Sequence, residues 1–255
     1  MSEPVSEPWS GPPADTPVPG AVLALAAGRP LTPLWLNELG GLTYLVGEDQ
    51  VVKWSPTSAR IDLGAEAAKL AWASPHLSVP RVLDTGGDDT GTWLLTVRLP
   101  GENAVTQRWR ADPATAVRAV GEGLRALHDR LPVDRCPFEW SATTRLAVKG
   151  AHGDGSGLDA LREPPPVDLL VVCHGDACAP NTLIGDDGRW AGHVDLGRLG
   201  VGDRWADLAV ATWSTQWNYG DGWEQPLLDA YGIDPDQERT AYYRALWDAE
   251  PSRPA

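Results

Sequence analysis

Three oxygen-bearing side chains in the second half of the chain have the types and spacing that phosphoryl transfer requires. Asp176 is followed five residues later by Asn181, and Asp195 lies fourteen residues further on, at the end of a short apolar run. Phosphoryl transfer needs a carboxylate to orient the attacking hydroxyl and oxygen ligands to hold Mg²⁺ on the phosphates. The pattern predicts that Asp176 orients the hydroxyl and that Asn181 and Asp195 hold the metal. A chance loop with a turn-forming Asp and Asn is the alternative.

A lysine within an apolar strand of the first half could bind phosphates. The chain has only three lysines, Lys53, Lys69 and Lys149, and Lys53 lies in the apolar run Val51–Trp54. An unpaired ammonium is costly to desolvate there, so we expect Glu66 on the following helix to pair with it, as a strand lysine and a helix glutamate do in kinases. Lys53 would then hold the α- and β-phosphates of ATP. A solvated lysine at a strand end is the alternative.

A short glycine-containing segment is the one candidate for a loop that covers phosphates. Gly40 and Gly41 separate two runs of strand-forming residues. They lack the Gly-x-Gly-x-x-Gly spacing of protein kinases, so a plain hairpin turn explains them equally well. No Walker A signature is present, which excludes the P-loop class of nucleotide-binding proteins.

The overall composition suits a globular protein with an acidic surface. Its 255 residues, 42% of them hydrophobic, exclude general disorder and allow one or two domains. The longest apolar stretch, residues 20–28, is shorter than the roughly 20 residues that cross a membrane. A net charge of −14 argues against a nucleic-acid partner, which would need a basic patch, and favours cationic partners.

The cysteines and the first residues indicate a reducing compartment. Cys136, Cys173 and Cys178 form no Cys-x-x-Cys pair, and their odd number argues against a disulfide framework or a zinc site. Residues 1–20 are rich in proline and lack the basic start and apolar region of a signal peptide. We therefore expect a flexible tail over residues 1–20 and a cytoplasmic protein without a membrane partner.

Strand formers dominate the first part of the chain, and helical patterns dominate the rest. The alanine-rich run Leu63–Ala73 predicts one helix among five strands, and Asp112 followed by proline predicts the N-cap of a helix that reaches about His128. The predicted organisation is a small β-rich lobe over residues 21–100 and a larger helical lobe over residues 101–255. The predicted strands are Leu34–Leu36, Thr43–Val46, Val51–Trp54, Val79–Leu83, Thr92–Leu99, Val167–Val172 and Trp190–Leu196; the further predicted helices are Trp205–Ser214 and Asp236–Asp248, with a loop or broken helix over Lys149–Pro166.

The segments around these residues resemble the aminoglycoside phosphotransferase family. The resemblance rests on His174-Gly175-Asp176 with Asn181, on Asp195–Gly200 and on Asp203–Ala209. It is close over residues 167–212 and looser over 30–250. Within the family the chain is most similar to kinases of the 3′-hydroxyl of kanamycin and neomycin and to streptomycin 3″-kinases. The resemblance implies an α+β, bilobal, protein-kinase-like fold that uses ATP and Mg²⁺ and confers antibiotic resistance.

The resemblance also assigns supporting roles. It implies that the backbone of Val97 and Leu99 contacts adenine and that His174 bonds backbone around the catalytic loop. Arg198 either approaches Asp176 and the transferred phosphate or forms a structural ion pair. Arg204 is expected to pair with Asp203 and Asp207, and His128 and His193 read as ordinary core or surface histidines.

A polycationic drug would need acidic groups around its acceptor hydroxyl. Any single candidate is also readily explained as a solvated surface acid. The candidates are Asp154, Asp159, Glu163, Asp221, Glu224, Asp248 and Glu250.

Two departures from the family pattern leave the drug open. The segment Trp213–Tyr219 stands where known 3′-kinases carry acids, and residues 251–255 displace a terminal carboxylate that helps bind drug in those enzymes. Trp213, Trp217 and Trp223 either stack on a sugar or fill the core, and the core is the preferred reading for most of them. The alternatives are a streptomycin 3″-kinase, a kinase of another hydroxylated antibiotic or metabolite and, less favoured, a pseudokinase. We expect a monomer or weak dimer.

Overall fold

The chain forms two compact units. The computed structural model describes residues 11–13, 15–59, 61–152, 161 and 163–249, with side chains described up to residue 147 in the segment that ends at 152. The first unit takes in the described residues of 1–72 and 80–98, and the second takes in those of 73–79 and 99–252. The predicted α+β composition, with strands first and helices after, is confirmed.

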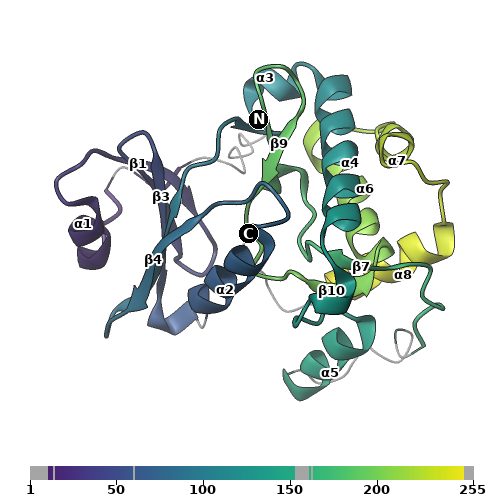
Figure 1. Cartoon of the computed structure of the whole chain (residues 1–255), viewed down its shortest axis with the longest axis horizontal. Coiled ribbons are helices and arrows are strands. Elements are labelled where there is room, and N and C mark those ends of the chain that lie inside the picture. The colour runs from purple at the N-terminus through teal and green to yellow at the C-terminus, as the bar shows by residue number, and fades with distance from the viewer. Residues whose placement is uncertain (1–10, 14, 60, 153–160, 162, 250–255) are drawn as a thin grey trace, which may run out of the picture. The chain divides into compact units, whose positions relative to one another are not determined.

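An antiparallel five-stranded sheet forms the first unit (Figure 1). Its strand order is β1-β2-β3-β5-β4, so β3 lies at the centre and carries Lys53 opposite Thr43 of β2 and Leu94 of β5. The strands are β1 (Leu31–Leu36), β2 (Leu42–Val46), β3 (Gln50–Pro56), β4 (Val82–Gly87) and β5 (Gly91–Val97).

Two helices pack on opposite faces of this sheet. Val52 of β3 joins a core with Val22 and Ala26 of α1 (Gly20–Ala26), whereas its neighbour Lys53 bonds Glu66 of α2 (Leu63–Ala73). Successive side chains of a strand point to opposite faces, which separates the apolar core from the ion pair. A 3₁₀ turn (Thr57–Ala59) precedes α2.

The described residues of the second unit include six α-helices (Figure 1). The side chain of Asp112 caps α4 by accepting from the Thr115 amide, and Pro113 occupies the first helical position, where its missing N–H costs nothing. Buried residues at helical spacing on α4, among them Val117, Val120 and Leu124, face α7 and the strands. The helices are α3 (Gln107–Arg110), α4 (Pro113–Arg130), α5 (Ala142–His152), α6 (Trp205–Tyr219), α7 (Glu224–Tyr231) and α8 (Gln237–Asp248).

Short strands form two small sheets in the described part of the second unit. Strand β10 (Gly200–Asp203) pairs with β7 (Leu170–Cys173), and the order β6-β8-β9 joins β6 (Glu102–Asn103), β8 (Thr182–Ile184) and β9 (Trp190–His193). Two 3₁₀ turns, η2 (Val133–Arg135) and η4 (Ala179–Asn181), complete the unit. No helix among the described residues has the length and apolar content to cross a bilayer.

Several element bounds differ from the predicted ones. Strand β7 starts at Leu170 because its pairing with β10 begins there, opposite Asp203, while Val167 and Leu169 lie outside the ladder and are exposed. Strand β9 ends at His193 because Asp195, at φ 64°, leaves the extended conformation. Helix α5 runs to His152, so the segment predicted as a loop or broken helix from Lys149 begins in helix. Helices α1, α3, α5 and α7 and strands β6, β8 and β10 were not predicted.

Candidate active site

Strand β7 ends in the loop that carries Asp176. Gly175 adopts φ +82°, and a Cβ atom there would lie 2.3 Å from the carbonyl oxygen of Arg198. Only glycine fits this turn, because any side chain would be both strained and in collision with backbone. The turn brings the loop against the segment that follows Asp195.

Asn181 ties Asp176 to the strand that precedes Asp195. Its Nδ2 donates to the Asp176 carbonyl oxygen at 2.9 Å, and its own carbonyl accepts from the Val194 amide at 3.0 Å. Asp195 lies near enough for its charge to raise the pKa of Asp176. The structure thus brings together the three residues that the sequence pattern singled out.

The carboxyl group of Asp176 is buried and lies near other charged side chains. Burial and then the charge of Asp195 raise its pKa, while Arg198 and His174 oppose the rise. Oxygen Oδ1 is buried and has no hydrogen-bond partner among the described residues. Buried carboxylate oxygens are normally paired, so this atom is suited to accept a bond from an incoming hydroxyl.

His174 fixes the shape of the loop through both ring nitrogens. Nδ1 accepts from the Asp176 amide at 3.2 Å, so Nε2 carries the proton and donates to the Val194 carbonyl at 3.0 Å. The ring is buried and packs edge-on against His193 at a centroid distance of 5.7 Å. Burial lowers the pKa of His193 to about 3, which keeps that neighbour neutral.

Asp207 of α6 binds the backbone of the loop that carries Asp176. Its carboxylate accepts from the backbone amides of His174 at 2.6 Å and Gly175 at 2.9 Å, and from Nε2 of His128 at 3.0 Å. Burial favours protonation, but the bonds from His128 and Gly175 bring the pKa of Asp207 below its ordinary value. The sequence analysis missed this role, although a carboxylate in an apolar helix already requires partners.

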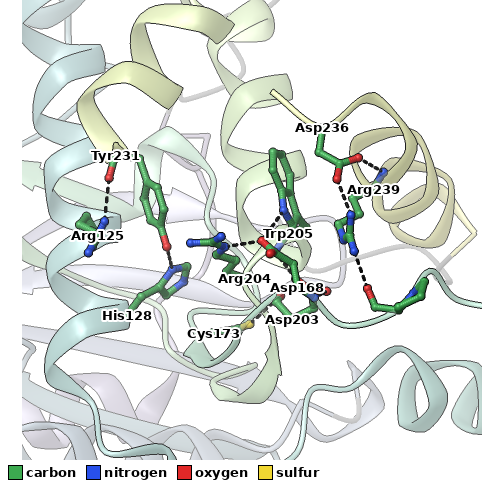
Figure 2. Close-up of polar contacts among 11 residues, drawn as sticks. Arg125, His128, Asp168, Cys173, Asp203, Arg204, Trp205, Tyr231, Asp236 and Arg239 are labelled. Atoms are coloured by element: carbon green, nitrogen blue, oxygen red, sulfur yellow. Dashed lines mark hydrogen bonds and ion pairs between the residues drawn. The ribbon is translucent and has the colours of Figure 1, made fainter. Parts of the chain in front are cut away.

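Arg204 has a partner other than the predicted ones. Its Nε donates to Asp168 at 2.6 Å, and the indole nitrogen of Trp205 donates to the same oxygen at 3.0 Å (Figure 2). Asp203 instead accepts the backbone amides of Asp168 and Trp205. The predicted ion pair with Asp203 and Asp207 is therefore wrong, because both carboxylates are used by backbone and His128.

Arg198 lies between two tryptophan rings. Its guanidinium carbon is 5.6 Å from the Trp140 ring centroid and 5.7 Å from that of Trp247. A guanidinium held on aromatic faces keeps its charge while losing little freedom. Its charge lowers the pKa of Asp176, so Arg198 acts on the carboxylate electrostatically.

Lys53 and Glu66 form an ion pair in the first unit. Nζ donates to Oε1 at 2.7 Å, and the glutamate is buried. The turn with Gly40 and Gly41 joins β1 to β2, and the side chain of Asn37 accepts the amides of Leu39 and Gly41. The hairpin reading of these glycines describes the observed turn.

Comparisons with known proteins identify relatives of the chain. The family model described as "Phosphotransferase enzyme family" matches residues 37–243. The chain belongs to this family. It is 37% identical to an aminoglycoside 3′-phosphotransferase of Streptomyces ribosidificus over 75% of this chain and 82% of the relative. It is also 32% identical to a streptomycin 3″-kinase of Streptomyces griseus, over 91% of this chain and 97% of the relative.

Solved structures of similar phosphotransferases extend the comparison to the fold. An aminoglycoside 3′-phosphotransferase of type VIII has a TM-score of 0.74 and 28% identity, covering 90% of this chain and 98% of that one. A Streptomyces rimosus aminoglycoside phosphotransferase, solved with ADP and streptomycin, has a TM-score of 0.66 and 26% identity, covering 90% and 96%. The predicted kinase-like fold and family are confirmed.

The backbone expected to contact adenine lies at the end of β5 in this phosphotransferase. The Val97 amide donates to the Arg81 carbonyl at 2.9 Å, so a bond from Val97 to adenine would have to come from its carbonyl oxygen. Leu99 follows two residues later as the first residue of the second unit's main segment.

The acidic residues predicted to bind the drug differ from one another in exposure and in ion pairing. Asp154, Asp159 and Glu250 lie outside the described residues. Glu163, Asp221 and Asp248 are exposed. Glu224 pairs with Arg244 at 2.7 Å and accepts from the amide of Gln216, so its charge is balanced within the protein.

The tryptophans near the end of α6 divide between core and surface. Trp213 and Trp217 are in contact, with ring centroids 5.1 Å apart, and Arg244 lies over Trp213 at 5.4 Å. Trp223 packs against the core, whereas Trp217 is 53% exposed. Trp217 therefore lies on the surface, whereas the core was expected for most of these tryptophans.

The donor set of this site suits Mg²⁺ better than a metal held by protein alone. The described residues contain no group of three or more His, Cys, Asp or Glu side chains that could hold a metal ion. Mg²⁺ uses one or two carboxylates together with phosphate oxygens and water. One carboxylate and one amide oxygen, from Asp195 and Asn181, fit that requirement.

Proposed function

We propose that this phosphotransferase transfers the γ-phosphoryl group of ATP to a hydroxyl of an aminoglycoside, most specifically the 3′-hydroxyl of kanamycin- or neomycin-type drugs. The observation that carries the proposal is the grouping of Asp176, Asn181 and Asp195 around one loop, with a buried, unpartnered oxygen on Asp176. The relatives named above supply the acceptor class. Phosphorylation of the drug would confer resistance on a cell in whose cytoplasm ATP and drug meet.

Each residue has a defined task in this reaction. Asp176 accepts a hydrogen bond from the acceptor hydroxyl and orients its oxygen for in-line attack. Asn181 and Asp195 would hold Mg²⁺, which neutralises charge on the phosphates when bound. Lys53, kept in place by Glu66, binds the α- and β-phosphates, and the backbone of Val97 and Leu99 contacts adenine.

The acidic protein attracts a polycationic acceptor. With a net charge of −14, the chain raises the local concentration of cations by steering. The exposed carboxylates of Glu163, Asp221 and Asp248 are the described candidates for contacts with ammonium groups. Asp154, Asp159, Glu224 and Glu250 complete the proposed set, with Glu224 available only if Arg244 releases it.

A coupled assay of ADP release tests the proposal. Purified protein, ATP and Mg²⁺ are combined in turn with kanamycin, neomycin, ribostamycin and streptomycin. Turnover that depends on a 3′-hydroxyl drug supports the proposal, and turnover with streptomycin alone selects a 3″-kinase. No drug-dependent turnover with any of the four refutes the substrate class. ADP release with a neutral hydroxyl compound instead would identify a kinase of another metabolite.

A pseudokinase is disfavoured because the phosphate-binding pair and all three residues of the catalytic grouping are present. We propose that the enzyme acts as a monomer or weak dimer. Sedimentation across a range of concentrations measures that state independently of activity.

A further inference from the structure

Tyr231 occupies a position that the chemistry proposed above does not use. It ends α7, is buried, and places its hydroxyl 2.8 Å from Nδ1 of His128 on α4 (Figure 2). The two rings meet edge to face at a centroid distance of 5.6 Å. A buried tyrosine hydroxyl can donate to or accept from a histidine nitrogen, and the direction of that bond is tied to which ring nitrogen carries the proton.

The groups around Tyr231 fix the direction of this bond. Burial raises the pKa of Tyr231 to about 12, so its hydroxyl keeps its proton. Arg204 lies on the other side of the hydroxyl, between Tyr231 and Asp168 in Figure 2, close enough for its positive charge to act on the hydroxyl oxygen. Because this positive charge repels the hydroxyl proton, the proton points away from Arg204 and toward Nδ1 of His128, 2.8 Å away.

The proton on His128 is therefore left on Nε2. That nitrogen lies 3.0 Å from Oδ2 of Asp207, the oxygen that also accepts from the His174 amide. With the other tautomer, a nitrogen lone pair would face an ionised carboxylate across 3.0 Å, in a place closed to water. The hydroxyl of Tyr231 thus favours the one tautomer that keeps Asp207 bonded to the loop.

We propose that Tyr231 is a positioning residue for the catalytic loop. Through His128 and Asp207 it holds the backbone of His174 and Gly175, and so sets the place of the Asp176 carboxylate. The expected effect of Tyr231 on the rate of turnover rests on the function proposed above. Its expected effect on the order of the loop does not depend on any substrate.

The isosteric variant Tyr231→Phe tests both parts. Loss of one buried hydrogen bond is expected to lower kcat by about three- to tenfold with KM for ATP changed less than about twofold. Amide hydrogen exchange over residues 171–178 is expected to quicken by a similar factor. If the wild-type protein has no drug-dependent turnover, the proposed function fails while the exchange measurement still decides this inference.

A double-mutant cycle separates positioning from a general loss of stability. In His128→Gln the side-chain amide can donate to Asp207 without a tautomer, so adding Tyr231→Phe is expected to change exchange over residues 171–178 less than about 1.5-fold. Equal effects of Tyr231→Phe in both backgrounds would overturn the inference. So would a Tyr231→Phe variant in which loop exchange matches that of the wild type.

Tyr219→Phe is the matched control. Tyr219 of α6 is also largely buried, and its hydroxyl donates to the Ala104 carbonyl at 2.8 Å. Removing this hydroxyl breaks a bond of the same kind in the same unit without touching His128. If Tyr219→Phe quickens exchange over residues 171–178 as much as Tyr231→Phe does, the inferred path through His128 is wrong.

Discussion

Asn181 donates from Nδ2 to the carbonyl oxygen of Asp176 at 2.9 Å. This bond uses the amide nitrogen and leaves the Oδ1 oxygen of Asn181 as the side chain's acceptor, which is the atom that a hard cation prefers. One residue therefore closes the catalytic loop and presents a metal ligand. A carboxylate at position 181 could bind the cation but could not donate to Asp176.

Asp176→Asn is expected to abolish most turnover. Loss of the carboxylate removes the group that orients the hydroxyl, which is worth about 10²- to 10⁴-fold in kcat. KM for ATP should stay within about threefold, because the nucleotide contacts are made by other residues. Steady-state kinetics with the preferred drug measure both constants. A kcat within a factor of about five of wild type would remove Asp176 from the mechanism.

Arg198→Gln is expected to shift the acid limb of the kcat/KM profile to higher pH. Burial and Asp195 already raise the pKa of Asp176, and Arg198 opposes that rise. Removing the positive charge lets the pKa rise further, so more alkaline conditions are needed to ionise the carboxyl group. Arg198→Lys retains the charge and should shift the limb less. A limb that stays in place or moves to lower pH contradicts this account.

Glu66→Gln is expected to raise KM for ATP by about tenfold or more. The carboxylate holds Nζ of Lys53 at 2.7 Å, and hydrogen bonds between charged groups contribute about 1.5–3 kcal/mol. Lys53→Met should lower kcat/KM for ATP further, since it removes the phosphate contact itself. Lys69→Met, on the same helix as Glu66, is the matched control. Equal losses in Lys69→Met and Lys53→Met would speak against a specific role for Lys53.

Asp207→Asn is expected to destabilise the protein by about 3 kcal/mol or more at neutral pH. The change leaves a buried amide facing the backbone donors of His174 and Gly175. The folded-state pKa of Asp207 lies below the ordinary value of 3.8, so its stabilisation is fully present above that value and is lost as pH falls through the folded pKa. Chemical denaturation at several pH values measures this loss.

Asp203→Asn is a control in which the pH dependence of the free energy of unfolding is expected to change in the opposite direction. Burial raises the pKa of Asp203, so the folded state binds the proton more tightly than the unfolded one. Ionisation of Asp203 therefore lowers the free energy of unfolding as pH rises from 3.8 through the folded-state pKa. If both variants changed the pH dependence of unfolding in the same direction, the assigned electrostatics of these two buried carboxylates would be wrong.

The sequence predicted those parts of the site that depend on local spacing. Asp176 and Asn181 lie in one loop, and Lys53 and Glu66 lie on consecutive elements, so short-range patterns were enough to pair them. The strand-rich and helix-rich halves followed from periodicity for the same reason.

Contacts between distant segments could not be predicted. Asp207 meets His174 across 33 positions, and Tyr231 meets His128 across 103. No local pattern relates such residues, because the packing of α4, α6 and α7 brings them together. The partner of Arg204 was missed for the same reason: Asp168 is 36 positions away, whereas Asp203 and Asp207 are close in sequence but already bonded elsewhere.

The structure of the reaction product tests the central claim most directly. The protein is incubated with ATP, Mg²⁺ and a kanamycin- or neomycin-type drug, and the product is analysed by mass spectrometry and by ¹H and ³¹P NMR, with Asp176→Asn as the parallel control. We expect a drug heavier by one phosphoryl group, esterified at a ring hydroxyl, and almost none of it from the variant. Unmodified drug from the wild-type protein, or equal product from Asp176→Asn, would contradict it.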